Sequence, residues 1–146
     1  MRVEYQERLH VLESSLQELG ALCLRAVRGG VDALTTQDVE LCDEVIAFDD
    51  EIDSRYHRIE KMVEEVLALE TPVASDLRLV LAVLHNSIHL ERVGDQSVTI
   101  AKLTKLSAKF EPHHELVEGL REMGNRCDEM LTVALDSFAG RDGERA

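Results

Sequence analysis

Residues 77–102 read LRLVLAVLHNSIHLERVGDQSVTIAK, a proline-free stretch with a helical pattern. Mostly apolar residues repeat along it at alternating spacings of four and three, the spacing of residues on one face of a helix. Two acids, Glu91 and Asp95, stand on this line where apolar residues are expected, one helical turn apart. The full line is Leu77, Leu81, Leu84, Ile88, Glu91, Asp95, Val98 and Lys102. Because neighbouring carboxylates are costly to bury without a cation, the stretch predicts both a packed helix and a candidate cation site.

The composition extends the helical reading to the whole chain. The 146 residues suit one domain, and hydrophobic residues make up 45% while aromatic residues make up only 3%. The core is therefore expected to consist of Leu, Val, Ile and Ala. Two prolines and eight glycines leave long stretches without a helix breaker. We expect an all-α protein, an antiparallel up-down helical bundle.

Charge and cysteine content exclude several classes of function. A net charge of −13 disfavours nucleic acid and anionic membrane surfaces as partners. The start of the chain has no apolar signal core, and no stretch approaches a membrane span, so we expect a cytoplasmic protein without membrane insertion. Cys23, Cys42 and Cys127 form no CxxC pair, and we interpret Cys23 and Cys127 as small core residues.

Four long helices are expected, each with an apolar line. The pattern predicts helices over residues 3–34, from the break at 35–38 to 69, over 71–109, and from 112 onward. Thr35 and Asp38 resemble a capping box, Thr71-Pro72 suits a helix start, and Pro112 opens the last helix. The first helix carries Leu9, Leu12, Leu16, Leu19, Cys23, Ala26 and Gly30; the second carries Cys42, Val45, Asp49, Ile52, Tyr56, Ile59, Val63 and Val66; the last carries Leu116, Leu120, Met123, Cys127, Met130, Ala134 and Phe138.

The last helix repeats the first at a shift of 104 residues. Gly20 then aligns with Gly124, Cys23 with Cys127, and Val31 with Leu135. We therefore divide the chain into a three-helix repeat, residues 1–110, and the first helix of an incomplete second repeat, residues 111–146. The apolar line of the last helix is expected to pack on the first unit or on another chain.

A second group of acids lies on the second helix. Asp49 and Asp53 are four residues apart, and Glu60 lies near the same face two turns later. Counted from Thr71, Asp53 and Asp95 are offset by six residues, about 9 Å along the helices. The acids could thus form one extended cluster, two separate sites, or a solvated surface without any metal. Oxygen ligands without histidine favour hard cations, or iron and manganese.

Other metal and catalytic sites find little support in the sequence. A helical di-iron enzyme needs two Glu-x-x-His motifs, whereas the chain has one, Glu111 to His114, across a proline. His85 and His89 are four residues apart, a spacing at which two histidines of a helix can bind one metal ion, but a polar helix face explains them equally. The sequence contains no phosphate-binding loop, nucleophile elbow or proline-bearing phosphoacceptor motif, so we expect that the protein is not an enzyme. Gly94, inside a helix, suggests that a neighbouring helix or a metal cluster approaches the backbone.

Several of these segments together resemble one known family. Asp76-Leu77-Arg78, followed in the same helix by Glu91-Arg92-Val93-Gly94-Asp95, resembles the hallmark of the phosphate-uptake regulator family, PhoU. The segment 49–60 is similar to that family's second helix, and 71–76 to the entry of its third. The likeness covers nearly the whole chain.

The resemblance implies a bundle of two three-helix repeats with E/D-x-x-x-D motifs that hold multinuclear metal clusters. The metal would be iron most commonly, with zinc or manganese as alternatives. The ligand candidates carried over by position are Asp49, Asp53, Glu60, Glu91 and Asp95. The resemblance further implies a negative regulator of phosphate uptake that links the ATPase subunit of a phosphate ABC transporter to a sensor histidine kinase.

The chain departs from the family pattern in its second repeat, of which this sequence holds one helix and none of the acidic motifs. We expect either a natural form shorter than a two-repeat ancestor or a fragment of a longer chain. A homo-oligomer formed through the last helix could rebuild a six-helix assembly. Two function classes stay open: a metal-binding regulatory adaptor, and a metal-free helical interaction module whose acids are surface charge. A metal store or metal-dependent enzyme is a third, weaker possibility.

Overall fold

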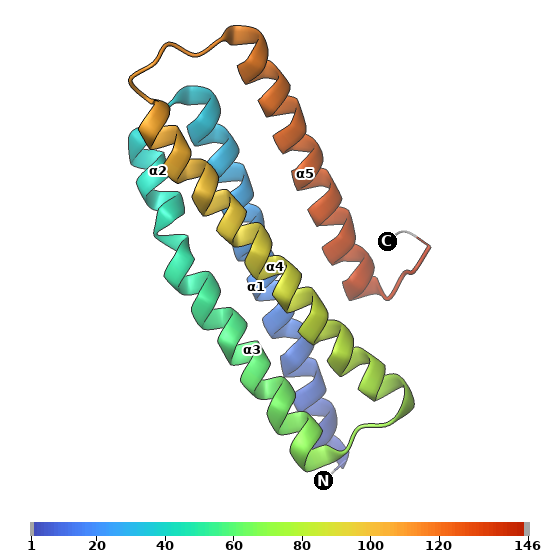
Figure 1. The fold of residues 1–146 in the computed structure, drawn as a ribbon. Helices are drawn as coiled ribbons and strands as arrows, with labels where there is room; N and C mark the ends of the chain where they lie inside the picture. Colours follow the sequence, from blue (N-terminus) through green and yellow to red (C-terminus); the bar gives the residue numbers. More distant parts are fainter. Residues whose placement is uncertain (1, 145–146) are drawn as a thin grey trace.

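The computed structural model describes residues 2–144, and all regular structure in this range is helical. Figure 1 shows long helices side by side that run alternately up and down, with α5 along one side of the others. The antiparallel up-down bundle expected from the sequence is confirmed. The helices are α1 (Arg2–Thr36), α2 (Val39–Ile46), α3 (Phe48–Glu70), α4 (Ala74–Ser107) and α5 (His114–Gly140).

The first helix, α1, is the centre of the bundle and contacts each of the other four helices. Its apolar line is buried as the spacing predicted: Leu12, Leu19 and Cys23 have no exposed surface. Around it pack Ile52, Ile59 and Val63 from α3. Burying a large aliphatic side chain contributes about 1.5–3 kcal/mol, so this line is the main source of stability.

The expected second helix is divided into two helices, α2 and α3. Ala47 ends α2 with φ −67° and ψ −15°, and its N–H donates to the carbonyls of Asp43 and Val45. Because these angles remain helical, the apolar line continues in register across the break, with Val45 and Ile52 both buried. No glycine or proline marks the break, so the sequence carried no signal for it.

The expected capping box at Thr35 is wrong. The N-cap of α2 is Asp38, whose carboxylate accepts hydrogen bonds from the N–H groups of Glu40 and Leu41, both 3.0 Å. Thr35 instead donates to the carbonyl of Asp32. The reason is that α1 continues to Thr36 and ends where Gln37 takes the left-handed conformation, with φ 54°.

The two helices predicted to start at Thr71-Pro72 and at Pro112 both start later in the chain than the sequence suggested. Thr71 is the C-cap of α3, in the left-handed conformation with φ 45°, and α4 begins three residues later at Ala74. Pro112 precedes α5, which begins at His114. Thr71 uses its backbone to end one helix and so cannot cap the next.

The face of α4 that enters the core differs from the line read off the sequence. Leu81 on the expected line is 37% exposed, and Glu91 and Asp95 lie half-buried at the flank. The acids therefore do not replace core leucines. The true core face is rich in small residues, which hid it in the hydropathy pattern: Val80, Val83, Ser87, Leu90, Gly94, Ser97, Val98, Ala101 and Thr104.

Helices α1 and α5 pack through two reciprocal contacts at glycines. A Cβ placed on Gly20 would lie 2.5 Å from Leu135 Cδ2, and one placed on Gly124 would overlap Val31. At the shift of 104 residues, Gly20 corresponds to Gly124 and Val31 to Leu135. The two contacts are thus equivalent, as expected for repeated helices related by a two-fold axis. The division of the chain at residue 110 stays a prediction.

The apolar line of α5 is not covered by the bundle. Leu116, Met123 and Met130 are 61%, 63% and 72% exposed. Cys127 on the same line is exposed too, so its interpretation as a core residue is wrong, whereas Cys23 is buried. The residues of α5 that approach α1 come from the adjacent face, where Gly124 allows close approach.

Candidate metal centre

Three carboxylates from two helices meet on one side of the bundle. Asp53 comes from α3, and Glu91 and Asp95 come from α4. Each offers an oxygen within 4.8 Å of an oxygen of the other two, a spacing that could hold a metal ion. Asp53 is exposed, and the two α4 acids are half-buried.

The close approach of α3 and α4 at Gly94 places these acids together. Ile52 lies against Gly94, and a Cβ at Gly94 would lie only 2.6 Å from Ile52 Cδ1. Asp53 and Asp95 are the residues that follow this pair in their helices. A neighbouring helix therefore occupies the space above Gly94, one of the two explanations that the sequence allowed.

The expected offset of six residues between Asp53 and Asp95 is reduced to four, because α4 starts later than predicted and Asp95 lies 21 residues after Ala74. Asp53 lies 17 residues before Glu70, the last residue of α3, and Glu91 lies 17 residues after Ala74, the first residue of α4. At equal rise per residue, Asp53 and Glu91 are therefore level in the antiparallel pair. One turn further along α4, Asp95 faces the same space.

The cluster is poor in positive charge. Burial raises the pKa of Glu91, and the carboxylates of Asp95 and Asp53 raise it further, while Arg92 lowers it. Within residues 2–144, no Lys or Arg forms an ion pair with any of the three acids. A cation between them would relieve this repulsion.

Asp49 and Glu60, the other two ligand candidates, lie outside the cluster. Asp49 Oδ2 is 3.8 Å from Lys102 Nζ. Glu60 accepts a hydrogen bond of 3.0 Å from the Tyr56 hydroxyl and lies 3.3 Å from His57 Nδ1. The structure thus joins three of the five candidates and gives the other two different neighbours. Metal binding by any of them stays a prediction.

Three monodentate carboxylates suit a hard or borderline cation. Such ions take six or more oxygen ligands, so the protein would fill only part of the coordination shell. Water, or oxygens of a bound partner, would complete it. The donor set therefore fits an ion such as iron or manganese better than a closed tetrahedral zinc site.

Cys23 lies behind the cluster but remains a protonated core thiol. Its Sγ donates a 3.1 Å hydrogen bond to the carbonyl of Leu90. Burial raises the pKa of Cys23 to about 12, and the charge of Glu91 raises it as well. Because a metal-binding thiol must be deprotonated, Cys23 is not expected to be a ligand.

The alternative metal sites considered from the sequence do not assemble in the described part of the chain. His85, His89, Glu111 and His114 are all exposed. None of them joins a group of three potential metal ligands within residues 2–144.

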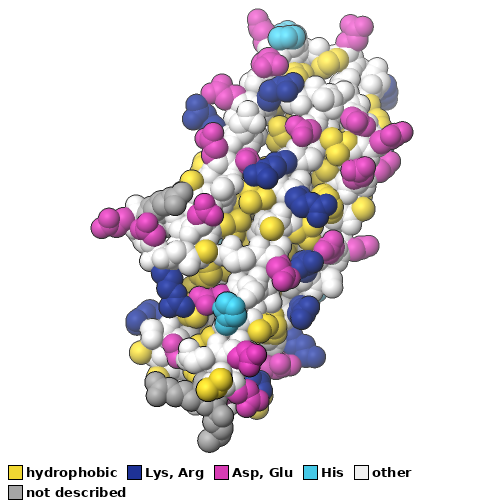
Figure 2. Space-filling model, turned by 180° about the vertical axis from the view of Figure 1, so that it is seen from behind, with side chains coloured by type: hydrophobic (Ala, Val, Ile, Leu, Met, Phe, Trp, Pro, Cys, Tyr) yellow, Lys and Arg dark blue, Asp and Glu magenta, His cyan; other side chains and the backbone are white. Residues whose placement is uncertain are grey.

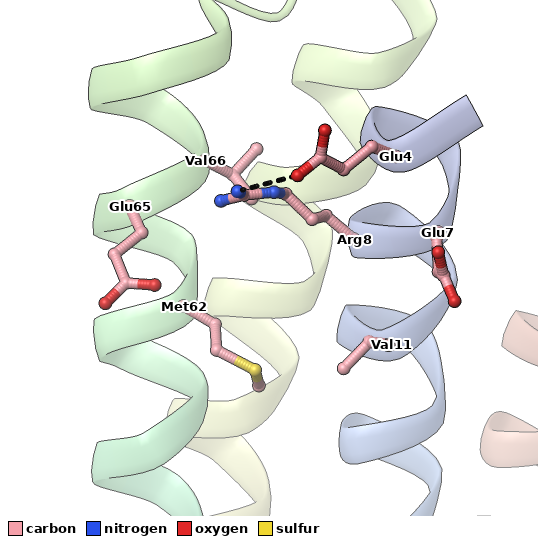
Figure 3. A pocket seen from close by; sticks show the side chains of 7 residues that line it. All are labelled: Glu4, Glu7, Arg8, Val11, Met62, Glu65 and Val66. Carbon is pink, nitrogen blue, oxygen red and sulfur yellow. Dashed lines mark ion pairs between the residues drawn. The ribbon is translucent and has the colours of Figure 1, made fainter. Parts of the chain in front are cut away.

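A small cavity of about 290 Å³ lies between α1 and α3, at the other end of the bundle from the α2 helix (Figure 3). Arg8 lies 3.8 Å from Glu4 and 3.6 Å from Glu70. The lining also includes Glu7 and Glu65, so acids surround a guanidinium that is already paired. We interpret this cavity as part of the ion-pair surface that joins the helix ends.

The surface offers no binding region for polyanions on the face shown in Figure 2. Lys and Arg are interspersed there with Asp and Glu, and hydrophobic side chains lie between them. Together with the net charge of −13, this argues against a nucleic-acid partner. None of the helices in the described residues is long and apolar enough to span a membrane.

The fold and the site together define an all-helical bundle with a cluster of three acids between two of its helices. Comparison with known proteins narrows this class. The model of the PhoU domain matches residues 16–104, which include α2, α3 and nearly all of α4. The chain belongs to the PhoU family.

Relatives of known name agree with this assignment. The chain is 32% identical over 143 residues to the "Phosphate-specific transport system accessory protein PhoU homolog" of Clostridium acetobutylicum, covering 97% of this chain and 65% of the relative. It is 32% identical over 144 residues to the homolog of the same name from Pseudomonas aeruginosa, covering 98% and 59%. The chain thus spans about three fifths of the length of these relatives.

Two crystal structures share the fold. PhoU from Pseudomonas aeruginosa superposes with a TM-score of 0.91 at 29% identity, over 97% of this chain and 68% of that one. The phosphate transport system regulatory protein PhoU from Streptococcus pneumoniae gives 0.85 at 31% identity, over 97% and 66%. Both similarities extend over all five helices, because they cover nearly the whole chain.

Proposed function

We propose that this chain takes part in regulating phosphate transport. The observation that carries the proposal is the match to the PhoU domain, which contains both helices of the acidic cluster. The relatives that the chain matches are named as accessory proteins of phosphate-specific transport. No catalytic constellation stands out among the described residues, and we propose a non-enzymatic role.

The finer proposal is a metal-binding adaptor that acts in the cytoplasm. It would restrain phosphate uptake by contacting both the ATPase subunit of a phosphate ABC transporter and a sensor histidine kinase. The cluster of Asp53, Glu91 and Asp95 supports the metal-binding part, because three carboxylates meet there without a paired cation. Iron is the proposed metal, with manganese or zinc as alternatives.

Elemental mass spectrometry on untagged protein, purified without chelator, tests the metal. We expect iron, manganese or zinc at one or more per chain, and its loss in the Glu91→Ala/Asp95→Ala double variant. Asp49→Ala and Glu60→Ala are matched controls, since both residues lie outside the cluster and should leave the metal content largely unchanged. Protein that stays empty after incubation with excess iron would overturn the metal proposal.

Gene deletion in the source organism tests the regulatory role. Loss of this chain should raise phosphate uptake in phosphate-rich medium, and the wild-type gene should restore the low rate. A deletion strain with unchanged uptake would contradict the role in phosphate regulation. Restoration by the Glu91→Ala/Asp95→Ala variant would separate that role from metal binding.

The second candidate function is a metal-free helical interaction module. The exposure of Asp53 favours it, because exposed acidic groups are common without any ion. This candidate predicts that the Glu91→Ala/Asp95→Ala variant is more stable than the wild type under all metal conditions, since it only removes repulsion.

A further inference from the structure

A groove runs between α1 and α3 at the end of the bundle where α1 begins and α3 ends (Figure 3). Its floor is apolar. Val11 reaches into it from α1, Met62 reaches into it from α3, and the buried Val66 lies beside them. Val11 is 42% exposed. The packing of α1 on α3 therefore leaves an apolar strip in contact with water.

The rims of this α1–α3 groove are acidic. Glu7 on α1 and Glu65 on α3 line the groove and are exposed, and neither forms an ion pair within residues 2–144. Arg8, which also lines the groove, already lies 3.8 Å from Glu4 and 3.6 Å from Glu70. Each rim thus presents a carboxylate without an ion-pair partner.

Apolar and acidic positions alternate along the groove at intervals of about one helical turn. The positions, in order from the end of the bundle, are Val3, Glu7 and Val11 on α1, and Leu69, Glu65 and Met62 on α3. Val3 and Leu69, at the outer end, are 82% and 69% exposed. A pair of acids therefore lies between two pairs of apolar residues.

The connection from α3 to α4 holds the outer end of the groove in a fixed shape. Thr71 and Ala74 both take the left-handed conformation, with φ 45° and 50°, which is unfavourable for residues other than glycine. The Tyr5 hydroxyl of α1 donates a 3.1 Å hydrogen bond to Asp76, just past this connection. Backbone strain persists where the surrounding contacts enforce it, and it gathers at binding sites.

We infer that the α1–α3 groove is a docking site for a helix of a partner protein, with an apolar face flanked by Lys or Arg. Val3 and Val11 are eight residues apart, about 12 Å along α1, and a second helix spans this distance in the same number of residues. Two apolar side chains of that helix would cover the two apolar pairs, and a Lys or Arg between them would reach Glu7 or Glu65. The inference rests on the proposed adaptor role, which requires protein partners, and not on the metal site.

Charge and shape together favour this occupant. The rim carboxylates repel anionic lipids and nucleic acids and attract cationic side chains. The stem of a Lys or Arg packs on an apolar floor while its charged end reaches the rim. An inorganic cation would make no use of Val11 and Met62. A helix that lies along α1 and α3 covers the floor, the rims and the exposed outer end at once.

Calorimetric titration of the whole chain with a synthetic peptide tests the groove. The probe has about 20 residues of Leu, Ala and Lys, placed so that Leu forms one helical face and Lys flanks it. A peptide of the same composition in scrambled order is its control. We expect the patterned peptide to bind at least tenfold more tightly than the scrambled one.

Two matched pairs of variants locate the binding. Glu65→Lys reverses a charge at the rim and should weaken binding about tenfold. Glu64→Lys makes the same change at the neighbouring exposed position, which does not line the groove, and should weaken it much less. Val11→Ser, in the floor, should weaken binding about threefold. Val39→Ser on α2, where Val39 is 41% exposed, should leave it unchanged.

Methyl NMR gives a further readout that needs no variant. Met62 lies in the groove, whereas Met123 and Met130 are exposed on α5. In protein with isotope-labelled methionine methyl groups, the signal of Met62 should shift as the patterned peptide is added. The signals of Met123 and Met130 should stay in place.

Equal weakening by Glu65→Lys and Glu64→Lys would overturn the inference, because binding would then follow net charge alone. So would shifts at Met123 and Met130 in place of Met62, or no binding up to about 1 mM peptide. Spermidine that displaces the peptide at an equal concentration would identify a polyamine site and exclude the helix. Failure of the proposed regulatory role shows separately, as unchanged phosphate uptake in the deletion strain.

Discussion

Glu91 is half-buried beside two other carboxylates, and its negative charge is unfavourable in the metal-free protein. Burial first, and the charges of Asp95 and Asp53 next, raise its pKa. A carboxyl whose folded pKa is raised binds protons more tightly in the folded state. Stability therefore falls as the pH rises from the ordinary glutamate pKa through the raised value. The negative charge of Glu91, which lowers the stability of the metal-free protein, would attract a cation to this site.

We predict that Glu91→Gln stabilises the metal-free protein at pH 7, by about 0.5 kcal/mol, because it removes like-charge repulsion on a helix. The gain should shrink as the pH falls through the raised pKa of Glu91, because the wild-type carboxyl then becomes protonated. Urea unfolding in a series of buffers from pH 7 down to pH 4 measures both effects. Glu64→Gln, an exposed position on α3, serves as control. A less stable Gln variant at pH 7 would show that the carboxylate is already satisfied by a protein contact.

The three cysteines should differ sharply in reactivity. The raised pKa of Cys23, about 12, keeps its buried sulfur as a thiol, and burial raises the pKa of Cys42 as well. We predict that a disulfide reagent modifies Cys127 alone in the native, dilute protein and all three thiols in urea. Mass spectrometry of the labelled peptides gives the assignment. Fast labelling of Cys23 in native protein would mean that the bundle opens beside the acidic cluster.

At the scale of the helices, the contact between Ile52 and Gly94 decides the register of α3 against α4. The sequence predicted that something approaches Gly94, but hydropathy could not say which helix does so. The answer depends on the start of α4 at Ala74, three residues later than Thr71-Pro72 suggested. This start places Glu91 level with Asp53, and Asp95 one turn further on completes the cluster of three acids.

We predict that Gly94→Ala destabilises the protein by about 1 kcal/mol, because overpacking against Ile52 outweighs the better helix propensity of alanine. The additional variant Ile52→Val, which removes the Cδ1 atom nearest to Gly94, should recover part of the loss. Thermal unfolding of the single and double variants measures the coupling.

Gly119→Ala is the control for this contact, because nothing lies within 4 Å of a Cβ at that position on α5. It should stabilise the protein, by up to about 1 kcal/mol. If Gly94→Ala stabilised it equally, the close approach of α3 would be absent in solution. Weaker metal binding in Gly94→Ala alone would connect the register of α3 to the site.

At the scale of the whole molecule, the net charge of −13 opposes folding through repulsion between like charges. The ion pairs that connect different helices lie at the surface, such as Arg28 with Asp128 and Arg141 with Glu13. Exposed pairs contribute about 0–1 kcal/mol each and do not offset the general repulsion. The acidic surface therefore keeps the bundle soluble at the expense of stability.

We predict that NaCl raised from 20 to 500 mM increases the Tm of the dilute protein by a few degrees, because it screens this repulsion. Calorimetry at low protein concentration measures the shift. The Glu64→Gln/Glu65→Gln variant, which changes the net charge from −13 to −11, should show a smaller increase. A Tm that falls with salt would mean that the surface ion pairs dominate instead.

Much of the bundle could be predicted because it depends on local periodicity. The apolar line of α1 and the apolar line that continues from α2 into α3 are buried as the spacing indicated, for example at Leu16 and Ile59. The line of α4 was misplaced because Ser87, Ser97 and Thr104 fill its core face and have little hydropathy signal. Their hydroxyls instead donate to carbonyls of the preceding turn, which makes small polar residues acceptable in the core.

The sequence by itself determined the helical class, the family and the residue types that a cation would need, because these depend on local pattern and composition. Only the tertiary structure decided which acids meet, since that depends on the register of α3 and α4 and on the contact at Gly94. It also decided that the apolar line of α5 faces an open groove, because the packing of α5 on α1 uses the adjacent glycine face. Helical spacing defines a face, but only packing defines the neighbour of that face.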